Sequence, residues 1–365
     1  MLGCSSTAKP GFSARGYADA AAGAELPEAG QPDSGSEGGT ASPDAGDARA
    51  DAASDAGPAA CTLQVPKDQK TLTDAIAAAV DGDVICVADG TYVDTVTVSS
   101  KNRSLTLRAT GKSAIWNGEL LVAGGPGTGH SLVVEGFQFG CAPSNISLSG
   151  STGRVVVRNN VFDNACGYAL DLENNAAGSV TVVFEQNQLL DTSLSASLSA
   201  PLAGAKALVT LRNNLVSGGA GFGLLGDGAW ARYAVLGNTF SVDPGYTLVQ
   251  LDLGAGAGAG SSVRDNILAG GDTAISCLDC KKLDVARNLL FSGDATYGKV
   301  QLGEGNLEAD PLFRAADDFR LQLWSPALYA GRRKAGAPAD EDLASDIEGR
   351  PRPAVDIDMG AYQHE

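Results

Sequence analysis

Two carboxylates, Asp171 and Glu173, are the residues whose types and spacing best suit chemistry in this chain. They lie two positions apart in an alternating segment, so on a strand they point to the same side, about 6.7 Å apart. Two carboxylates at such a separation can act across a glycosidic bond, one as the acid and the other as the base. Asp163, Asp191 and Lys206 lie in segments that we expect to form nearby loops. The simpler interpretation, which we favour, is a pair of solvated acids on an outward strand face.

The elements that must position these acids belong to a repeat of about 25 residues. Six-residue segments with alternating apolar residues can be aligned on their last positions: Thr110, Phe137, Asn160, Asn187, Asn214, Asn238, Asn266 and Asn288. Successive last positions differ by 27, 23, 27, 27, 24, 28 and 22 residues. A period in this range is typical of a repeat architecture, and the alternation is typical of strands. No helical period interrupts the repeats, so the sequence predicts an all-β solenoid.

The aligned columns predict a parallel β-helix, in which each coil holds several short strands and coils stack about 4.8 Å apart. One apolar column, expected to face inward, contains Leu107, Val134, Val157, Phe184, Leu211, Val235, Val263 and Val285. The last column contains Asn160, Asn187, Asn214, Asn238, Asn266 and Asn288. Asparagine tolerates left-handed backbone, and its amide can bond to stacked neighbours on both sides. We therefore expect a buried asparagine ladder inside a tight bend.

An outward column just before this bend alternates in charge: Arg108, Glu135, Arg158, Glu185 and Arg212. Two interpretations are open, a binding strip or a column of surface salt bridges. We favour the salt bridges, because such pairs are common and each contributes little free energy.

A second series of strands carries Asp171. Its outward positions are expected at Ser147, Asp171, Ser197, Gly223, Gln250 and Ser276. Ser197 and Gly223 offer no carboxylate, and Asp252 lies about three coils, or roughly 14 Å, from Asp171. The sequence therefore predicts no acidic cluster that spans several coils on this face.

Residues 5–60 differ from the rest of the chain, because they consist mainly of Ala, Gly, Ser, Pro and Asp. Nine acids and three bases give this segment a net charge of −6 out of the total of −17. Such a segment cannot bury enough apolar surface to offset its chain entropy, so we expect a disordered acidic linker. The acidic balance of the whole chain argues against nucleic acid and anionic lipid as partners.

The start of the sequence, Met1-Leu-Gly-Cys4, resembles the lipobox of bacterial lipoproteins, in which the cysteine becomes the lipidated N-terminus. The apolar stretch that precedes a lipobox is missing. Two alternatives are open: a start codon placed too far downstream, which we favour, or an ordinary cysteine at Cys4. Under the first alternative Cys4 carries a lipid anchor, and the linker holds the folded part away from the membrane surface.

Six further cysteines, an even number, favour three disulfides in an oxidising compartment. The sequence suggests the pairs Cys61 with Cys86, Cys141 with Cys166, and Cys277 with Cys280, although it leaves the connectivity open. Cys141 and Cys166 lie about one coil apart, which is within reach of a disulfide. Zinc would need two more ligands beside Cys277 and Cys280, and the only histidines are His130 and His364. We therefore predict no metal site.

A short helix is expected over 71–80, where Thr71 followed by Asp74 resembles a capping box and the run is rich in alanine. The open end of a β-helix exposes apolar side chains and strand edges. We expect this helix to cover the N-terminal end of the solenoid.

The entry segment resembles that of right-handed parallel β-helix proteins of the pectin-lyase-like group. The matching residues are the alanine-rich run Ala75–Ala79, Gly82-Asp83, Val84–Val87 and Gly90-Thr91-Tyr92. The exit resembles bacterial surface proteins with a choice-of-anchor Q domain, through Asn306–Phe313, Phe319–Leu321, Ser325–Ala327, Gly349–Pro353 and Asp358–Tyr362. The resemblance covers about 61–365. It implies carbohydrate as the first substrate class to test.

Four regions follow from these observations: a lipobox-like start and linker (1–60), an N-terminal cap with the first strands (61–100), β-helix coils (101–305) and a C-terminal cap (306–365). The favoured function is a monomeric, lipid-anchored scaffold or polysaccharide-binding protein. We expect it on the bacterial outer membrane surface or outside the cell, and without a cofactor. The alternative is a polysaccharide lyase or glycoside hydrolase, and Ca²⁺ would enter only with the lyase. A cluster of acids or bases on adjacent coils would favour the enzyme, and the sequence shows no convincing one.

Overall fold

A computed structural model describes residues 59–364 apart from 100–101, 164–165, 175–177, 199–205, 220, 227–230, 254–259, 279 and 281. The chain divides into two units, Met1–Ala56 and Gly57–Glu365, and the structure described below is that of the second. Cys4 and the predicted linker up to residue 58 lie outside the described residues.

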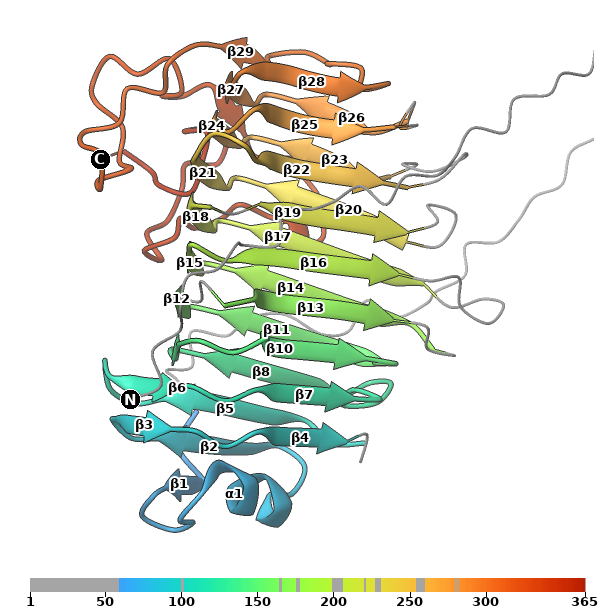
Figure 1. Ribbon diagram of the computed structural model, residues 1–365, viewed down its shortest axis with the longest axis vertical. Coiled ribbons are helices and arrows are strands. Elements are labelled where there is room, and N and C mark those ends of the chain that lie inside the picture. The colour runs from blue at the N-terminus through green and yellow to red at the C-terminus, as the bar shows by residue number, and fades with distance from the viewer. Residues whose placement is uncertain are drawn as a thin grey trace, which may run out of the picture. The chain divides into compact units, whose positions relative to one another are not determined.

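The second unit is a parallel β-helix (Figure 1). Each complete coil contributes one strand to each of three parallel sheets, which we name sheets A, B and C in the order in which the chain visits them. Strands of one sheet therefore come from successive coils and pair in parallel, because the chain has gone once round before it returns. This confirms the predicted all-β solenoid.

The strands of each sheet follow in stacking order. Sheet A contains β1 (Leu63–Val65), β2 (Asp83–Val87), β5 (Leu105–Ala109), β8 (Ser131–Glu135), β11 (Gly153–Arg158), β14 (Val180–Glu185), β17 (Ala207–Arg212), β20 (Ala231–Leu236), β23 (Ser262–Arg264) and β26 (Asp284–Ala286). Sheet B contains β3 (Gly90–Tyr92), β6 (Ala114–Trp116), β9 (Gln138–Phe139), β12 (Val161–Asp163), β15 (Gln188–Leu190), β18 (Leu215–Gly218), β21 (Thr239–Val242), β24 (Ile267–Gly270), β27 (Leu289–Phe291) and β29 (Leu307–Glu308). Sheet C contains β4 (Val96–Ser99), β7 (Leu120–Ala123), β10 (Ser144–Ser149), β13 (Tyr168–Asn174), β16 (Ser193–Leu198), β19 (Phe222–Gly226), β22 (Thr247–Asp252), β25 (Thr273–Cys277) and β28 (Asp294–Gly298).

The core fills the inside of the coils with stacked apolar columns. The predicted inward column of sheet A is in register from β5 to β26, and its members are at most 1% exposed: Leu107, Val134, Val157, Phe184, Leu211, Val235, Val263 and Val285. Phenylalanines stack in the same way, with ring centroids 4.8 Å apart for Phe139 and Phe162 and 5.5 Å for Phe162 and Phe184. Each coil therefore buries its apolar residues against the coils above and below it.

The bend between sheets A and B contains the asparagine ladder. Side-chain amides of successive coils donate to the next side-chain carbonyl over 2.9–3.2 Å, from Asn160 through Asn187, Asn214, Asn238, Asn266 and Asn288. The ladder continues to Asn306, which the sequence alignment missed. All six predicted members are at most 1% exposed.

The left-handed backbone of this bend does not lie at the ladder asparagines, so that part of the prediction is wrong. It lies one residue earlier, with φ between +52° and +58° at Asn159, Gln186, Asn213, Asp265 and Arg287. The reason is geometric: the residue with positive φ reverses the chain, and the next side chain then points inward, where its amide meets its stacked neighbours.

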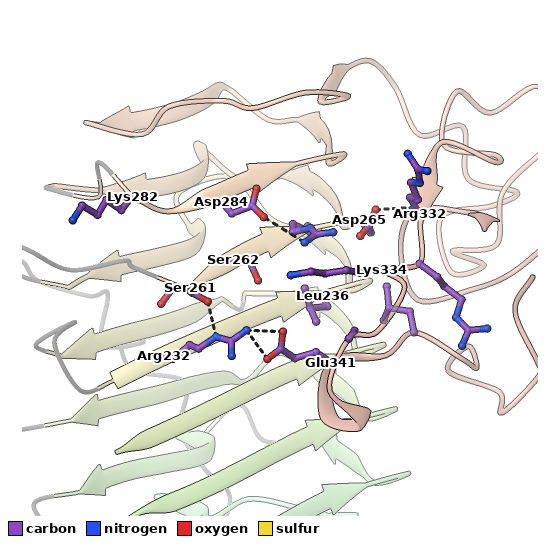
Figure 2. A pocket seen from close by; sticks show the side chains of 15 residues that line it. Arg232, Leu236, Ser261, Ser262, Asp265, Lys282, Asp284, Arg332, Lys334 and Glu341 are labelled. Atoms are coloured by element: carbon purple, nitrogen blue, oxygen red, sulfur yellow. Dashed lines mark hydrogen bonds and ion pairs between the residues drawn. The ribbon is translucent and has the colours of Figure 1, made fainter. Parts of the chain in front are cut away.

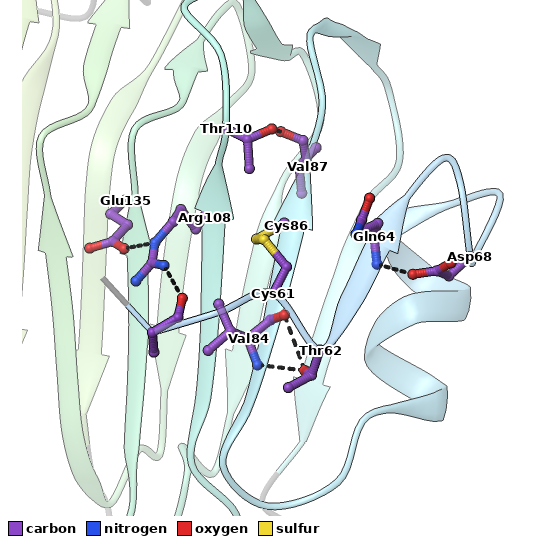
Figure 3. Close-up of a disulfide and its surroundings, with 11 residues drawn as sticks. Cys61, Thr62, Gln64, Asp68, Val84, Cys86, Val87, Arg108, Thr110 and Glu135 are labelled. Carbon is purple, nitrogen blue, oxygen red and sulfur yellow. Dashed lines mark hydrogen bonds and ion pairs between the residues drawn. A yellow bond between two sulfur atoms is a disulfide. The ribbon is translucent and has the colours of Figure 1, made fainter. Parts of the chain in front are cut away.

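Three disulfides join the cysteines as the sequence suggested. Their Cα–Cα distances are 5.6 Å for Cys61–Cys86, 5.3 Å for Cys141–Cys166 and 5.8 Å for Cys277–Cys280. Figure 3 shows the first of them, which ties the chain just before β1 to β2. Helix α1 (Leu72–Ala78) follows, and the Thr71 side chain caps it by accepting from the Asp74 amide over 3.0 Å.

The C-terminal segment, residues 306–364, begins with β29, the last strand of sheet B. It runs back along the outer side of the corner between sheets A and B (Figure 1), where it includes β30 (Gly331–Arg332), η1 (Ala339–Glu341) and β31 (Asp356–Ile357). Its apolar side chains cover outward residues of the coils: Leu343 and Ile357 pack with Leu236, and Ile347 and Ala361 pack with Leu215. We name the part of this segment that follows β29, residues 309–364, the strap.

The last strand of sheet C is less apolar than the strands before it. In β28, Thr296 and Gly298 continue the inward columns of Ile275 and Cys277. The last coil of sheet C therefore places a polar and a small residue where earlier coils have apolar ones. The outward apolar residues at the corner between sheets A and B are what the strap covers.

Candidate functional site

Strand β13 holds Asp171 and Glu173 on the outward face of sheet C. Leu170 and Leu172, which alternate with the acids, are fully buried in the core. The neighbouring strands β10 and β16 place serines beside both acids: Ser147 and Ser195 flank Asp171, while Ser149 and Ser197 flank Glu173. The local alternation therefore fixes both acids on the outward face, and neither neighbouring coil adds a third carboxylate.

The predicted register of this face is wrong at one strand. Ser195, not Ser197, is in line with Asp171, while Gly223, Gln250 and Ser276 follow Ser195 in the same column. The pairing of β13 with β16 shifts near Tyr168, and residues 193–198 alternate so regularly that Ser195 and Ser197 both face outward. Since alternation has a period of two, it cannot distinguish registers that differ by two residues.

The two acids lie in different environments. Asp171 is half-buried, and burial raises its pKa above the ordinary value, with a further contribution from the negative charge of Glu173. Glu173 is exposed. Among the described residues, neither acid forms a hydrogen bond or an ion pair. The expectation of two solvated acids is therefore wrong for Asp171, which is half-buried.

The three loop residues expected nearby do not assemble with this pair. Asp163 is exposed at the end of β12, and Asp191 accepts from the Gly219 amide over 3.0 Å. Lys206 is exposed beside Ser179. Within the described ranges, no hydrogen bond or ion pair connects any of the three to Asp171 or Glu173. The described residues thus offer two carboxylates on a polar face, and no acid or base from a described loop faces them.

Metal-ligating side chains do not cluster in the part of the chain that the structure describes. No group of three or more His, Cys, Asp or Glu residues there is arranged to hold a metal ion. No described helix combines the length and the apolar composition needed to cross a bilayer.

The charged column of sheet A forms the salt bridges that we favoured. Glu135 accepts from Arg108 and, over 2.7 Å, from Arg158, and Glu185 pairs with Arg212 over 2.6 Å. Burial alone would raise the pKa of Glu135, but the hydrogen bonds from Arg108 and Arg158 outweigh it and hold the pKa below its ordinary value.

Sequence reasoning missed a small pocket of about 150 Å³ between sheet A and the strap, which we name the strap pocket. Its floor comes from β20, β23, β26 and the turns before them, and its wall comes from the strap (Figure 2). The lining is rich in charge: Arg232, Arg264, Lys282, Arg332, Arg333, Lys334, Asp265, Asp284 and Glu341. One sequence signal could have indicated this pocket. The alternating charges in the outward column of sheet A end after Arg212, where the column continues with Leu236 and then Arg264.

Several of these charges are paired. Arg232 binds Glu341 of the strap over 2.6 Å, and Arg264 lies 3.3 Å from Asp284. Asp265 binds Arg287 over 3.1 Å and accepts from the Arg332 backbone amide over 3.0 Å. Burial raises the pKa of Asp265 even so, because the favourable charge of Arg287 only partly compensates it.

The three parallel sheets define the chain as a parallel β-helix protein. No protein-family model matches the chain, and no curated protein sequence matches it significantly. A search of solved structures finds similarity to the crystal structure of pectate lyase Pel9A, with 11% sequence identity and a TM-score of 0.41. The match covers 80% of this chain and 91% of the pectate lyase chain. The parallel strand pairing by itself defines the fold.

Proposed function

We propose that this chain is a scaffold that binds polysaccharide on the outward face of sheet C and does not cleave it. The observation that carries the proposal is the setting of Asp171 and Glu173. Both acids stand on an open face whose neighbouring positions are serines, so the face offers hydroxyl and carboxyl groups that can hydrogen-bond to sugar hydroxyls. Among the residues that the structure describes, no second catalytic group stands opposite this pair, as glycosidic cleavage would need.

A panel of purified polysaccharides tests this proposal when binding and product release are measured on the same samples. We expect binding of at least one polysaccharide without release of shorter products. Release of products that stops in the Asp171→Asn, Glu173→Gln double variant, with folding intact, would replace the scaffold proposal with the lyase or glycosidase alternative.

A bulky substitution locates the binding face. Ser195→Trp would place a large side chain beside Asp171 on sheet C, whereas Ser217→Trp places the same side chain at a partly exposed position of β18 in sheet B. We expect the first variant to lose polysaccharide binding and the second to retain it. Equal polysaccharide binding by both variants would show that the binding site does not lie on this face of sheet C.

We also propose, from the sequence alone, that Cys4 carries a lipid and that the protein lies on the bacterial outer membrane surface or outside the cell as a monomer. The support is the lipobox-like start, together with three disulfides, which favour an oxidising compartment. Mass spectrometry of the N-terminal peptide from the native producer tests the anchor. An unmodified Cys4 in the mature protein would contradict it.

A further inference from the structure

We propose that the strap pocket binds a phosphoryl group, either as inorganic phosphate or as a phosphate monoester on a larger molecule. This proposal is independent of polysaccharide binding on sheet C. It rests on the charges of the pocket, on donors that lack partners, and on the size of the cavity.

The pocket is positive in a strongly negative chain. Its lining contains six cations and three acids, which gives a net charge of +3, whereas the whole chain carries −17. The partners just outside the lining do not change this balance, because Asp342 binds Arg333 and Arg287 binds Asp265. A local positive potential of this kind attracts anions.

The strap already shows how this side of sheet A binds anionic groups. Its acidic turn places Asp340 2.6 Å from Arg154 and Glu341 2.6 Å from Arg232. The Arg212 side chain donates to backbone carbonyls of the same turn over 2.6 and 2.7 Å. These contacts occupy Arg154, Arg212 and Arg232 of sheet A with groups of the strap.

Donors inside the pocket remain available. Lys334 is exposed, and no ion pair involves it among the described residues. Figure 2 shows Lys334 extending across the pocket in the direction of Ser262. The Nε atom of Arg264 is buried and has no hydrogen-bond partner within the described part of the chain. An ammonium, a guanidinium N–H and a hydroxyl are together suited to a group with several oxygens.

Size and charge favour phosphate over a sugar ring or a carboxylate. About 150 Å³ is well below the roughly 300–1,000 Å³ of pockets that enclose whole ligands, so the cavity suits one small group. A phosphate monoester carries about −1.5 to −2 charge at pH 7 and three acceptor oxygens, whereas a carboxylate carries −1 and two. The dianion therefore neutralises more of the net charge of +3 and uses all three donors.

The test measures the melting temperature and the heat of binding of the full chain with inorganic phosphate, with glucose 6-phosphate and with galacturonate. Potassium chloride of equal ionic strength serves as the reference. A ligand that binds only the folded state raises the melting temperature as its concentration exceeds Kd. We expect phosphate to raise it beyond the chloride reference and galacturonate not to. Binding of glucose 6-phosphate identifies a pocket open to monoesters, and binding of inorganic phosphate alone identifies a closed one.

Two exposed lysines provide matched variants. Lys334→Met removes one positive charge from the pocket, and Lys70→Met removes one positive charge near α1, outside the pocket. We expect phosphate affinity to fall about tenfold or more in the first variant, since a charged hydrogen bond is lost, and to stay unchanged in the second. Equal stabilisation by chloride, equal binding of galacturonate, or unchanged phosphate affinity in Lys334→Met would each overturn the proposal.

Discussion

Each ladder asparagine is satisfied on every side by other residues of the bend. The Asn187 amide nitrogen donates to Val157 and Asn214 over 2.9 and 3.2 Å, and the Asn187 carbonyl accepts from the backbone and side chain of Asn160. A buried polar group is costly only when it loses its partners. The complete ladder therefore stabilises the fold, whereas the loss of any one asparagine leaves polar groups of its neighbours without partners.

The first prediction concerns the ladder. Asn187→Leu removes the side-chain donor to the Val157 carbonyl and the acceptor of the Asn160 backbone amide. We therefore expect the free energy of unfolding to fall by at least about 1–3 kcal/mol. Chemical denaturation measures it. Asn117→Leu makes the same change at an exposed position outside the ladder and should alter stability little. A wild-type melting temperature in Asn187→Leu would contradict a cooperative ladder.

The second prediction concerns pH. Because the pKa of Asp171 is raised in the folded state, ionising it costs folding free energy, and the wild-type protein loses stability as pH rises from 3.8 through the raised value. Asp171→Asn removes this loss. We expect the variant to be more stable than wild type at pH 7 and equally stable below the ordinary pKa. Asp252→Asn, at an exposed position on the same sheet, is the control. Lower stability of Asp171→Asn at pH 7 would show that the charged form is favoured instead.

The sequence predicted most of the asparagine ladder, but neither its last member nor the raised pKa of Asp171. The asparagine column was visible because six coils repeat it at similar spacing. Asn306 was missed because it follows Asn288 by only 18 residues, although Asn306-Leu307 repeats the pattern of Asn288-Leu289. The raised pKa of Asp171 depends on how closely neighbouring coils pack around it, and alternation carries no information about that.

At the scale of elements, polar contacts centred on Arg352 add to the apolar contacts that hold the strap. This side chain is 4% exposed and donates to the carbonyls of Asp358 and Gly360 over 2.9 and 2.6 Å, and to Asn213 over 3.2 Å. Burial lowers the pKa of Arg352 to about 10, so it stays charged at neutral pH. One guanidinium therefore connects two parts of the strap to the bend of the β-helix.

The third prediction tests this role. Arg352→Met leaves several buried carbonyls without a donor, so we expect opening of the strap to become easier by at least about 1–3 kcal/mol. Hydrogen exchange should then speed up over residues 339–363, while β14 and β17 keep their protection. Lys334→Met changes an exposed residue of the same strap and should leave exchange unchanged. Equal loss of protection in the strap and in the coils would show that the two unfold together.

The strap also marks the limit of sequence reasoning about elements. Repeats predicted the strands of sheet A correctly because each coil constrains the next. The strap has no repeat, and its contacts connect residues more than 100 positions apart, such as Arg232 with Glu341. Its position along the corner, and with it the strap pocket, follows from outward apolar residues such as Leu236 and Leu215, which look like ordinary variation in the repeat.

At the scale of the whole molecule, charge is distributed unevenly. Residues 5–60 carry a net charge of −6, and the lining of the strap pocket carries a net charge of +3. The two neighbouring acids of β13, Asp171 and Glu173, lie on sheet C. A solenoid keeps such features apart, because each repeat contacts only its neighbours. The two proposed sites can therefore be altered one at a time, and a substitution at one is expected to leave the other intact.

The fourth prediction concerns the boundary between the two units of the chain. The composition of residues 5–60 predicts rapid tryptic cleavage after Arg15 and Arg49, whereas β1 pairs with β2 and Cys61, just before β1, is joined to Cys86 of β2. We expect a resistant product that begins after Arg49. Lys67 and Lys70 are exposed between β1 and α1, so some cleavage there is also expected.

The disulfide makes this prediction specific. Without reductant, a chain cut after Lys67 stays attached through Cys61–Cys86, so the mass of the product changes by only one water. In the Cys61→Ser, Cys86→Ser double variant the same cut should release the peptide that contains β1, and the remaining core should melt at a lower temperature. Intact mass spectrometry with and without reductant separates these outcomes. A full-length chain that resists trypsin as long as the core does would show that the first sixty residues are protected and that composition alone misjudged them.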